Sequence, residues 1–341
     1  MADIDIFSIK PSVISRDLSG KSFFIYGAKK SGKTSNAVKF PKPLLLAFEK
    51  GYNLLSGVKA QPINKWTEAL KVKKQLLKDA EMVEKGEKES TFYSTIVCDT
   101  ADLAYDQCEK YILDKEGVDY LDETENKRGY KAVSREFDNY FQEIVKAGYT
   151  LVVISHSEIV QVKENGEKYD KIQPTVSKRG LQVLSRLVDV MAYSTFEPND
   201  NGSQDMVLYL RGSKELEAGS RNKYMSAKIP FTYQALLEDM QQAIDKLEAE
   251  DGAVVTDAPI EVYQDQSEKL DFKKVKEEIK TLAKKFNKAG MMDEYKSVVE
   301  KHLGKGKLII DTTESQVDIL GLVLDDLKDM ESDVDKVLKE E

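Results

Sequence analysis

Apolar positions in the first two thirds of the chain form short uninterrupted runs, which alternate with longer stretches of helical spacing. Short apolar runs are typical of strands buried on both faces, and apolar residues three or four positions apart are typical of amphipathic helices. The predicted strands are residues 23–26, 44–48, 95–98, 150–154, 189–196 and 206–210. The predicted helices are residues 66–84, 101–113, 134–146 and 231–247. This alternation predicts an α/β domain over residues 1–247, with a mostly parallel sheet covered by helices.

One segment departs from this pattern. Residues 159–176 alternate between polar and apolar positions around Asn165-Gly166. Asn-Gly favours the tight turn that joins two antiparallel strands, so we expect a β-hairpin here.

The last third of the chain has a different character. Residues 248–265 hold six acids and no base, together with Gly252 and Pro259, and this composition predicts an acidic, solvated linker over residues 248–267. Residues 272–286, 292–303 and 316–330 then show helical periodicity. We therefore expect a small helical domain with a charged tail over residues 268–341.

Composition excludes several classes of protein. Two cysteines, Cys98 and Cys108, provide neither a disulfide framework nor metal-ligand spacing, which is typical of the reducing cytoplasm. No apolar run approaches the length of a membrane helix, and the mixed, charged start is not that of a signal peptide. We therefore expect a cytoplasmic protein that has no membrane partner.

The strongest motif follows the first predicted strand. Gly27-Ala28-Lys29-Lys30-Ser31-Gly32-Lys33-Thr34 matches the phosphate-binding pattern G-x-x-x-x-G-K-[ST] in full. Its backbone N–H groups, with the start of the next helix, would cradle the phosphates of ATP, and we expect that helix to run to Phe40. Lys33 would reach the β- and γ-phosphates, and the Thr34 hydroxyl would bind Mg²⁺. The predicted nucleotide-binding residues are Gly27, Ala28, Lys29, Lys30, Ser31, Gly32, Lys33, Thr34 and Ser35.

Three later strands end in residues that could complete a hydrolytic site. Asp99 ends the run TIVCD and is the candidate second Mg²⁺ residue beside Thr34. Glu49 follows the run LLLAF and is the candidate base that orients the attacking water. His156 follows the run LVVIS and could detect the γ-phosphate. Carboxyl ends of parallel strands share one edge, where ligands bind.

These motifs, GAKKSGKT, LLLAFEKG, TIVCDT and LVVISH, occur in an order that resembles the RecA-like ATPases. The chain is most similar to phage-encoded AAA-family ATPases with a RecA-like core that work with single-strand annealing and recombination functions. The resemblance covers roughly residues 10–247. It implies that Glu49 is the catalytic glutamate, Asp99 the Mg²⁺ carboxylate and His156 the sensor.

The resemblance also implies a homo-oligomer in which a basic pair contacts the nucleotide of the neighbouring subunit. Arg221 and Lys223 occupy that place, although their order and spacing depart from the family pattern. The segments after Asp99 and after His156 fall where RecA-like proteins carry loops that face DNA.

Charge is distributed in a way that permits contact with DNA. The formal net charge is −9, yet residues 1–247 hold as many bases as acids, so the excess acid belongs to the linker and the tail. Residues 126–135 and 171–186 contain bases and no acid, and such clusters can neutralise phosphates of single-stranded DNA. The predicted DNA contacts are Lys127, Arg128, Tyr130, Lys131, Arg135, Lys171, Lys178 and Arg179.

The favoured function is therefore a Mg²⁺-dependent ATPase associated with single-stranded DNA in phage recombination, annealing or replication. Two alternatives remain open: a P-loop kinase of a nucleoside or small metabolite, and an adaptor that binds ATP without hydrolysing it. The helical domain is a candidate docking site for recombination or single-strand-binding proteins.

Overall fold

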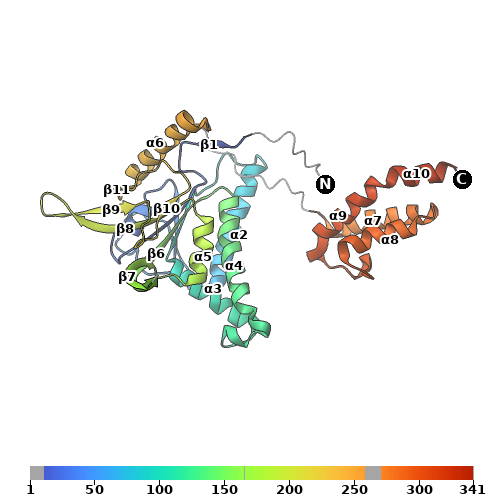
Figure 1. Cartoon of the computed structure of the whole chain (residues 1–341), viewed down its shortest axis with the longest axis horizontal. Coiled ribbons are helices and arrows are strands. Elements are labelled where there is room, and N and C mark those ends of the chain that lie inside the picture. Colours follow the sequence, from blue (N-terminus) through green and yellow to red (C-terminus); the bar gives the residue numbers. More distant parts are fainter. Residues whose placement is uncertain (1–10, 165, 258–269, 341) are drawn as a thin grey trace. The chain divides into compact units, whose positions relative to one another are not determined.

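The structure is a computed structural model that describes residues 11–164, 166–257 and 270–340 (Figure 1). These residues form two compact units, 11–257 and 270–340, and each is described by itself. The charged start of the sequence and Asn165 of the predicted turn lie outside the described residues. No helix in the described ranges is long and apolar enough to cross a membrane.

The first unit is built on a ten-stranded sheet. Six neighbouring strands, from β8 to the edge strand β4, are parallel, and β9 and β11 extend the sheet antiparallel beyond β8. Strand β10 pairs antiparallel with β8, and β7 pairs antiparallel with β6. The spatial order is β11 (Lys228–Pro230), β9 (Gln204–Tyr209), β8 (Val190–Pro198), β2 (Ser22–Gly27), β6 (Thr150–Glu164), β5 (Thr95–Asp99), β3 (Pro43–Ala47) and β4 (Ala60–Pro62), with β10 (Gly219–Ser220) and β7 (Glu167–Pro174) at its sides.

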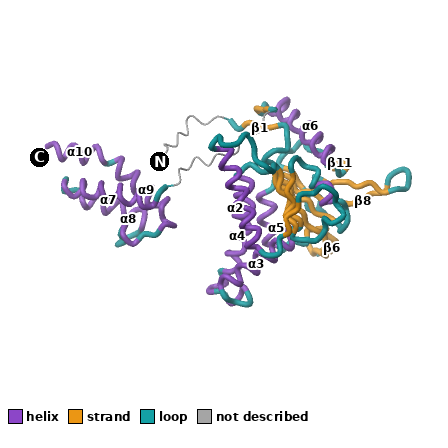
Figure 2. The backbone as a smooth tube through the Cα atoms, turned by 180° about the vertical axis from the view of Figure 1, so that it is seen from behind, coloured by secondary structure: helices purple, strands orange, loops and turns teal. Residues whose placement is uncertain are grey.

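Helices cover both faces of this sheet, as Figure 2 shows. One face carries α2 (Trp66–Glu84), α3 (Ala101–Glu116), α4 (Gly129–Lys146) and α5 (Lys178–Leu187). The short 3-10 helices η1 (Leu121–Glu123) and η2 (Glu125–Lys127) join α3 to α4. The other face carries α1 (Lys33–Ala37) and α6 (Tyr233–Asp251).

The core follows from the two-residue period of the strands. Along β2, Phe24 and Tyr26 pack into the cluster under α2–α5, whereas Phe23 and Ile25 pack into the cluster under α1 and α6. Both sets are buried, which explains why β2 is apolar without interruption. The predicted α/β class with a mostly parallel, doubly covered sheet is confirmed.

The second unit is helical. It contains α7 (Phe272–Lys288), α8 (Met292–Leu303), η3 (Ile309–Asp311), η4 (Glu314–Gln316), α9 (Val317–Asp329) and α10 (Glu331–Glu340). Their apolar stripes meet in a separate core that includes Ile279, Phe286, Leu320 and Leu327. The predicted small helical unit is therefore present, and Glu341 lies outside the described residues.

The predicted start of the linker is wrong. Helix α6 continues to Asp251, and β12 (Val254–Thr256) pairs in parallel with β1 (Val13–Ser15). Acids of this segment can pack against the first unit because the Arg16 guanidinium forms ion pairs with Glu248 and Asp257. Residues 248–256 thus belong to the first unit, whereas residues 258–267 of the predicted linker lie outside the described residues.

Two predicted helix boundaries also differ. Helix α1 ends at Ala37, and the chain reaches Phe40 through turns instead of a continued helix. Helix α4 begins at Gly129, ahead of the predicted residue 134, because the hydroxyl of Thr124 accepts a hydrogen bond from the Gly129 N–H at 2.8 Å. The predicted hairpin is confirmed by the pairing of β6 with β7, which runs to Glu164 opposite Glu167.

Candidate active site at the carboxyl edge of the sheet

The pairing of the parallel strands brings the predicted motifs together at the carboxyl edge of the sheet. Gly27 at the end of β2 pairs with His156 on β6, and Ala47 at the end of β3 pairs with Asp99 on β5. The backbone N–H of Glu49 also donates to the Asp99 carbonyl at 3.1 Å. The four motifs, which are far apart in sequence, therefore lie side by side, although β6 continues past His156 to Glu164, beyond the strand end predicted at residue 154.

Close contacts with β8 and β9 explain why two positions of the phosphate-binding pattern, Gly27 and Gly32, are glycines. A Cβ on Gly27 would lie 2.2 Å from the carbonyl oxygen of Ser194, so no side chain fits there. Gly32 has a φ of 70°, and a Cβ there would lie 2.7 Å from the side chain of Met206. The loop is further tied to β8 by a hydrogen bond of 3.0 Å between the hydroxyls of Ser31 and Ser194.

Lys33 lies folded into this loop. Its ammonium donates to the carbonyl oxygens of Gly27 and Ala28 at 2.8 and 2.7 Å, and its side chain is buried. Burial lowers the pKa of Lys33 to about 8, although the nearby carboxylates of Asp99, Glu49 and Asp102 oppose the shift. A buried cation inside a glycine-containing loop at the end of a strand is suited to bind phosphate.

Thr34 and Asp99 form the predicted Mg²⁺ pair. The Thr34 hydroxyl donates to Asp99 Oδ2 at 2.6 Å, which brings both oxygen donors together beside the loop. Burial raises the pKa of Asp99, and Glu49 adds to the effect, whereas the hydrogen bond from Thr34 opposes it. Mg²⁺ at nucleotide sites takes only one or two protein oxygens besides phosphate and water, so this pair fits the ion. In the described residues, no cluster of three or more acidic, His or Cys ligands offers an all-protein site.

Glu49 and His156 contact each other near the Thr34–Asp99 pair. His156 Nε2 lies 3.2 Å from Glu49 Oε2, while His156 Nδ1 is buried and has no hydrogen-bond partner among the described residues. Thr100 Oγ1, next to Asp99, is likewise buried without a partner in that set. Buried polar atoms without partners are rare, and two of them beside Asp99 and Glu49 fit a site that receives a polar ligand.

Asp102 is a residue that sequence reasoning missed. Its Oδ1 accepts hydrogen bonds from the hydroxyls of Ser155 (3.1 Å) and Thr175, while the Thr175 N–H donates to the His156 carbonyl at 3.1 Å. Asp102 therefore links α3, β6 and the segment that enters α5. Acids are common in the first turn of any helix, where they favour the helix dipole, so the sequence alone gave no reason to single it out.

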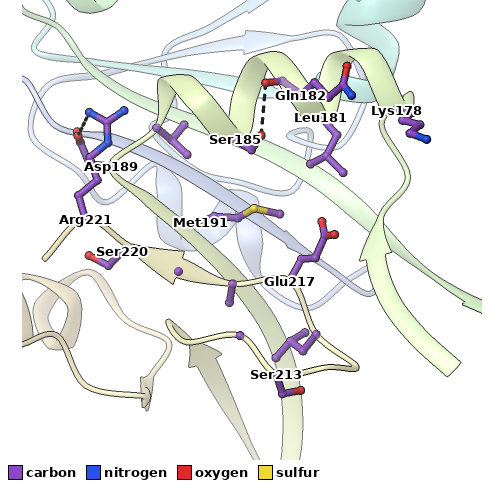
Figure 3. Close-up of a pocket in the computed structure, with 15 residues that line it drawn as sticks. Lys178, Leu181, Gln182, Ser185, Asp189, Met191, Ser213, Glu217, Ser220 and Arg221 are labelled. Carbon is purple, nitrogen blue, oxygen red and sulfur yellow. Dashed lines mark hydrogen bonds and ion pairs between the residues drawn. The ribbon is translucent and has the colours of Figure 1, made fainter. Parts of the chain in front are cut away.

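Arg221 and Lys223 lie away from this edge. Arg221 follows β10, which pairs with the first residues of β8, and its guanidinium forms an ion pair with Asp189 at 3.3 Å (Figure 3). Lys223 forms an ion pair with Asp251 at 2.8 Å. Both side chains remain more than half exposed, and a role toward a neighbouring subunit stays a prediction.

Figure 3 also shows the cavity at whose end Arg221 lies. It has a volume of about 840 Å³ and separates α5 from the loop at residues 212–221. Leu181 and Met191 project into it, and Gln182 of α5 also lines it. This cavity contains none of the predicted catalytic residues.

The two predicted basic segments come together. Helix α4 packs against α5, and the Arg179 guanidinium lies 4.0 Å from the centre of the Tyr130 ring. Lys131, Arg135 and Lys178 are exposed and have no ion-pair partner among the described residues. Lys127 and Arg128 instead pair with Asp122 and Glu125, and Lys171 pairs with Glu217.

The expected DNA-facing segments differ from simple loops. Thr100 leads directly from Asp99 into α3, and His156 lies within β6, which continues into the hairpin with β7. The exposed cations gathered by α4 and α5 are called the α4/α5 basic face below; they are Lys131, Arg135, Lys178 and Arg179.

A phosphate-binding loop at the end of a sheet strand, with a threonine whose hydroxyl donates to the carboxylate at the end of another strand, defines a P-loop nucleotide-binding protein. Residues 19–222 match the family model described as AAA domain, and the chain belongs to this family. Its core also carries the four motifs at one sheet edge, as expected of a RecA-like P-loop NTPase.

Two known proteins illustrate the likeness. The SPbeta prophage-derived uncharacterized protein YorG of Bacillus subtilis (strain 168) is 31% identical over 331 residues, which cover 96% of this chain and 98% of the relative. Among solved structures, the KaiC-like protein PH0186 of Pyrococcus horikoshii OT3 is 10% identical, covers 62% of this chain and 85% of its own, and has a TM-score of 0.32. The resemblance to phage-encoded AAA-family proteins is confirmed, whereas the recombination role stays a prediction.

Proposed function

We propose that this chain is a Mg²⁺-dependent ATPase whose turnover is coupled to single-stranded DNA in phage recombination, annealing or replication. The observation that carries the proposal is the meeting of Glu49 and His156 beside the Thr34–Asp99 pair, at the mouth of the phosphate-binding loop. Phosphoryl transfer to water needs a held phosphate, neutralised charge and an oriented water, and these residues match those needs.

Each side chain has a distinct part in this proposal. Lys33 exchanges its hydrogen bonds to the loop carbonyls for the β- and γ-phosphate oxygens of ATP. Glu49 is half-exposed, and its carboxylate is free to accept a proton from water once ATP is bound. Thr34 and Asp99 would hold Mg²⁺, which when bound neutralises charge on the phosphates.

His156 is placed to report the state of the γ-phosphate. It contacts Glu49 through Nε2, and its own carbonyl accepts from Thr175, close to the start of α5. A change at Glu49 therefore has a short covalent and hydrogen-bonded path to Lys178 and Arg179. This path supports coupling between ATP turnover and the α4/α5 basic face.

Hydrolysis is tested by measuring phosphate release from ATP and Mg²⁺ without any other acceptor. The expected result is steady release by the wild type and its loss in Glu49→Gln, with ATP binding retained. Glu89→Gln, which neutralises an exposed acid outside the site, is the matched control. Phosphate release only upon addition of a nucleoside or metabolite would favour the kinase, and tight binding without release would favour the adaptor.

DNA association is tested by the salt dependence of single-stranded DNA binding to the full chain. A polyanion held by exposed cations is released steeply as salt rises. The proposal expects such binding, together with faster ATP turnover when DNA is present. Absence of both would remove DNA from the proposed function.

The helical unit supports a further part of the proposal, the docking of recombination or single-strand-binding proteins. Leu308, Ile310 and Leu322 are large apolar side chains that are at least half exposed in this unit. Replacing all three by Ser should weaken capture of such partners, and unchanged capture would count against docking by this unit.

A further inference from the structure

A second cavity lies beside the α4/α5 basic face. It has a volume of about 480 Å³ and is bounded by α3 and the start of α5. Its lining mixes acceptors, donors and cations: Tyr105, Glu109, Ser177, Lys178, Arg179 and Gln182. Two of these, Lys178 and Arg179, belong to the α4/α5 basic face, so a strand bound there would pass the mouth of the cavity.

The cavity has the right size and chemistry for an unpaired base. A single base is smaller than this volume, and the polar lining offers hydrogen bonds to its edge. On the adjoining surface, the Arg179 guanidinium lies 4.0 Å from the centre of the Tyr130 ring, and both are groups on which a base can stack. Lys131 and Arg135 on α4 would contact the flanking phosphates.

Glu109 makes this cavity selective. Among the described residues its carboxylate has no hydrogen-bond or ion-pair partner, yet it is partly buried in the lining. Burial raises the pKa of Glu109, and Asp106 adds to the effect, whereas Arg179 opposes it. An ionised carboxylate only accepts hydrogen bonds, so its best partner is an amine.

We propose that this cavity binds an unpaired base of single-stranded DNA that carries an exocyclic amine, with Glu109 accepting from that amine. Cytosine, adenine and guanine offer such a group, whereas thymine offers only its N3–H, which lies between two carbonyl oxygens that the carboxylate would repel. The proposal rests on the proposed DNA function and adds a base preference to it. Glu109 is thus a specificity residue of the DNA site.

The test compares two pyrimidine strands of equal length and similar flexibility. Fluorescence anisotropy measures the affinity of the full chain for labelled oligo-dC and oligo-dT at one low salt concentration. We expect oligo-dC to bind about fivefold more tightly or better, which is the scale of one good base contact. In Glu109→Gln the amide both donates and accepts, so the preference should disappear through tighter binding of oligo-dT.

Glu116→Gln is the matched control, because it removes one exposed negative charge from the same helix outside the cavity. Loss of charge alone would strengthen binding of both strands equally and leave their ratio unchanged. Equal affinity of the wild type for both strands, or a preference that survives in Glu109→Gln, would overturn the proposal. Binding of neither strand would instead overturn the proposed DNA function itself, and retained ATP binding by Glu109→Gln would show that the variant is folded.

Discussion

The carboxyl edge of the sheet and the α4/α5 basic face differ in the burial of their charged side chains and in the partners those side chains have. At the sheet edge, Lys33 and Asp99 are buried and each has hydrogen-bond partners, so packing and hydrogen bonds hold both side chains in place. On the basic face, Lys131, Arg135 and Lys178 are exposed and have no ion-pair partner among the described residues. Chemistry on a phosphate needs the first kind of order, whereas a flexible polyanion is held by charge that can adjust to it.

Asp102 joins these two regions. It binds Ser155 on the strand that carries His156, and Thr175 at the entry to α5. One carboxylate thus contacts both the strand that carries His156, the proposed γ-phosphate sensor, and the segment that leads into the basic face.

Loss of the buried cation should have the largest effect. Lys33→Ala removes the charge that faces the β- and γ-phosphates, and we expect ATP turnover to fall by about a hundredfold or more. Phosphate release at saturating ATP measures this, with Lys74→Ala, which removes an exposed lysine of α2 outside the site, as the control. A comparable loss in both variants would indicate that burial at the edge gives no special role to Lys33.

The pKa of Lys33 predicts a pH effect of about tenfold. A lysine whose pKa is about 8 in the nucleotide-free chain is mostly charged at pH 7 and mostly neutral at pH 9. Phosphate binds the charged form, so ATP affinity should fall by about tenfold over that range. Fluorescent ATP analogues measure the change; constant affinity between pH 7 and 9 would contradict the cause given for the shift.

Breaking the link between the regions should have a smaller effect. Asp102→Asn keeps the shape but weakens acceptance from Ser155 and Thr175, and we expect the ratio of DNA-stimulated to basal turnover to fall about fivefold. Turnover with and without single-stranded DNA gives this ratio directly. If both rates fall together, Asp102 supports the edge alone and does not couple the two regions.

Single cations of the basic face should have the smallest effect. Lys131→Ala and Arg135→Ala should each weaken DNA binding by about two- to fivefold and reduce the salt dependence by about one phosphate contact. Lys127→Ala should do less, because its ammonium already lies 3.6 Å from Asp122. An equal loss of DNA affinity in all three variants would show that an ion pair within the chain does not reduce a cation's contribution to DNA binding.

The sequence patterns predicted which residues lie at the carboxyl edge of the sheet, but not the contacts among them. Gly27, Lys33 and Asp99 belong to motifs whose backbone context is local, so strand and loop could be placed from their own residues. The contact between Glu49 and His156 joins residues 107 positions apart and depends on the order of β3, β5 and β6 in the sheet. No local pattern specifies that order.

Surface charge was the least predictable feature. The two acid-free segments gave no sign that Tyr130 would lie under Arg179, since helix packing alone decides that contact. The acidic run after Glu248 resembled a linker by composition, and only the distant Arg16 allows its first part to pack. Partners remote in sequence therefore account for both surprises.

Coupling between the two regions is the central claim, and ATP turnover measured with and without single-stranded DNA tests it most directly. The full chain with ATP and Mg²⁺ should release phosphate faster as DNA is added, and rising salt should remove the increase while slow basal release continues. The same rate of phosphate release at every DNA concentration, at low salt, would contradict the account.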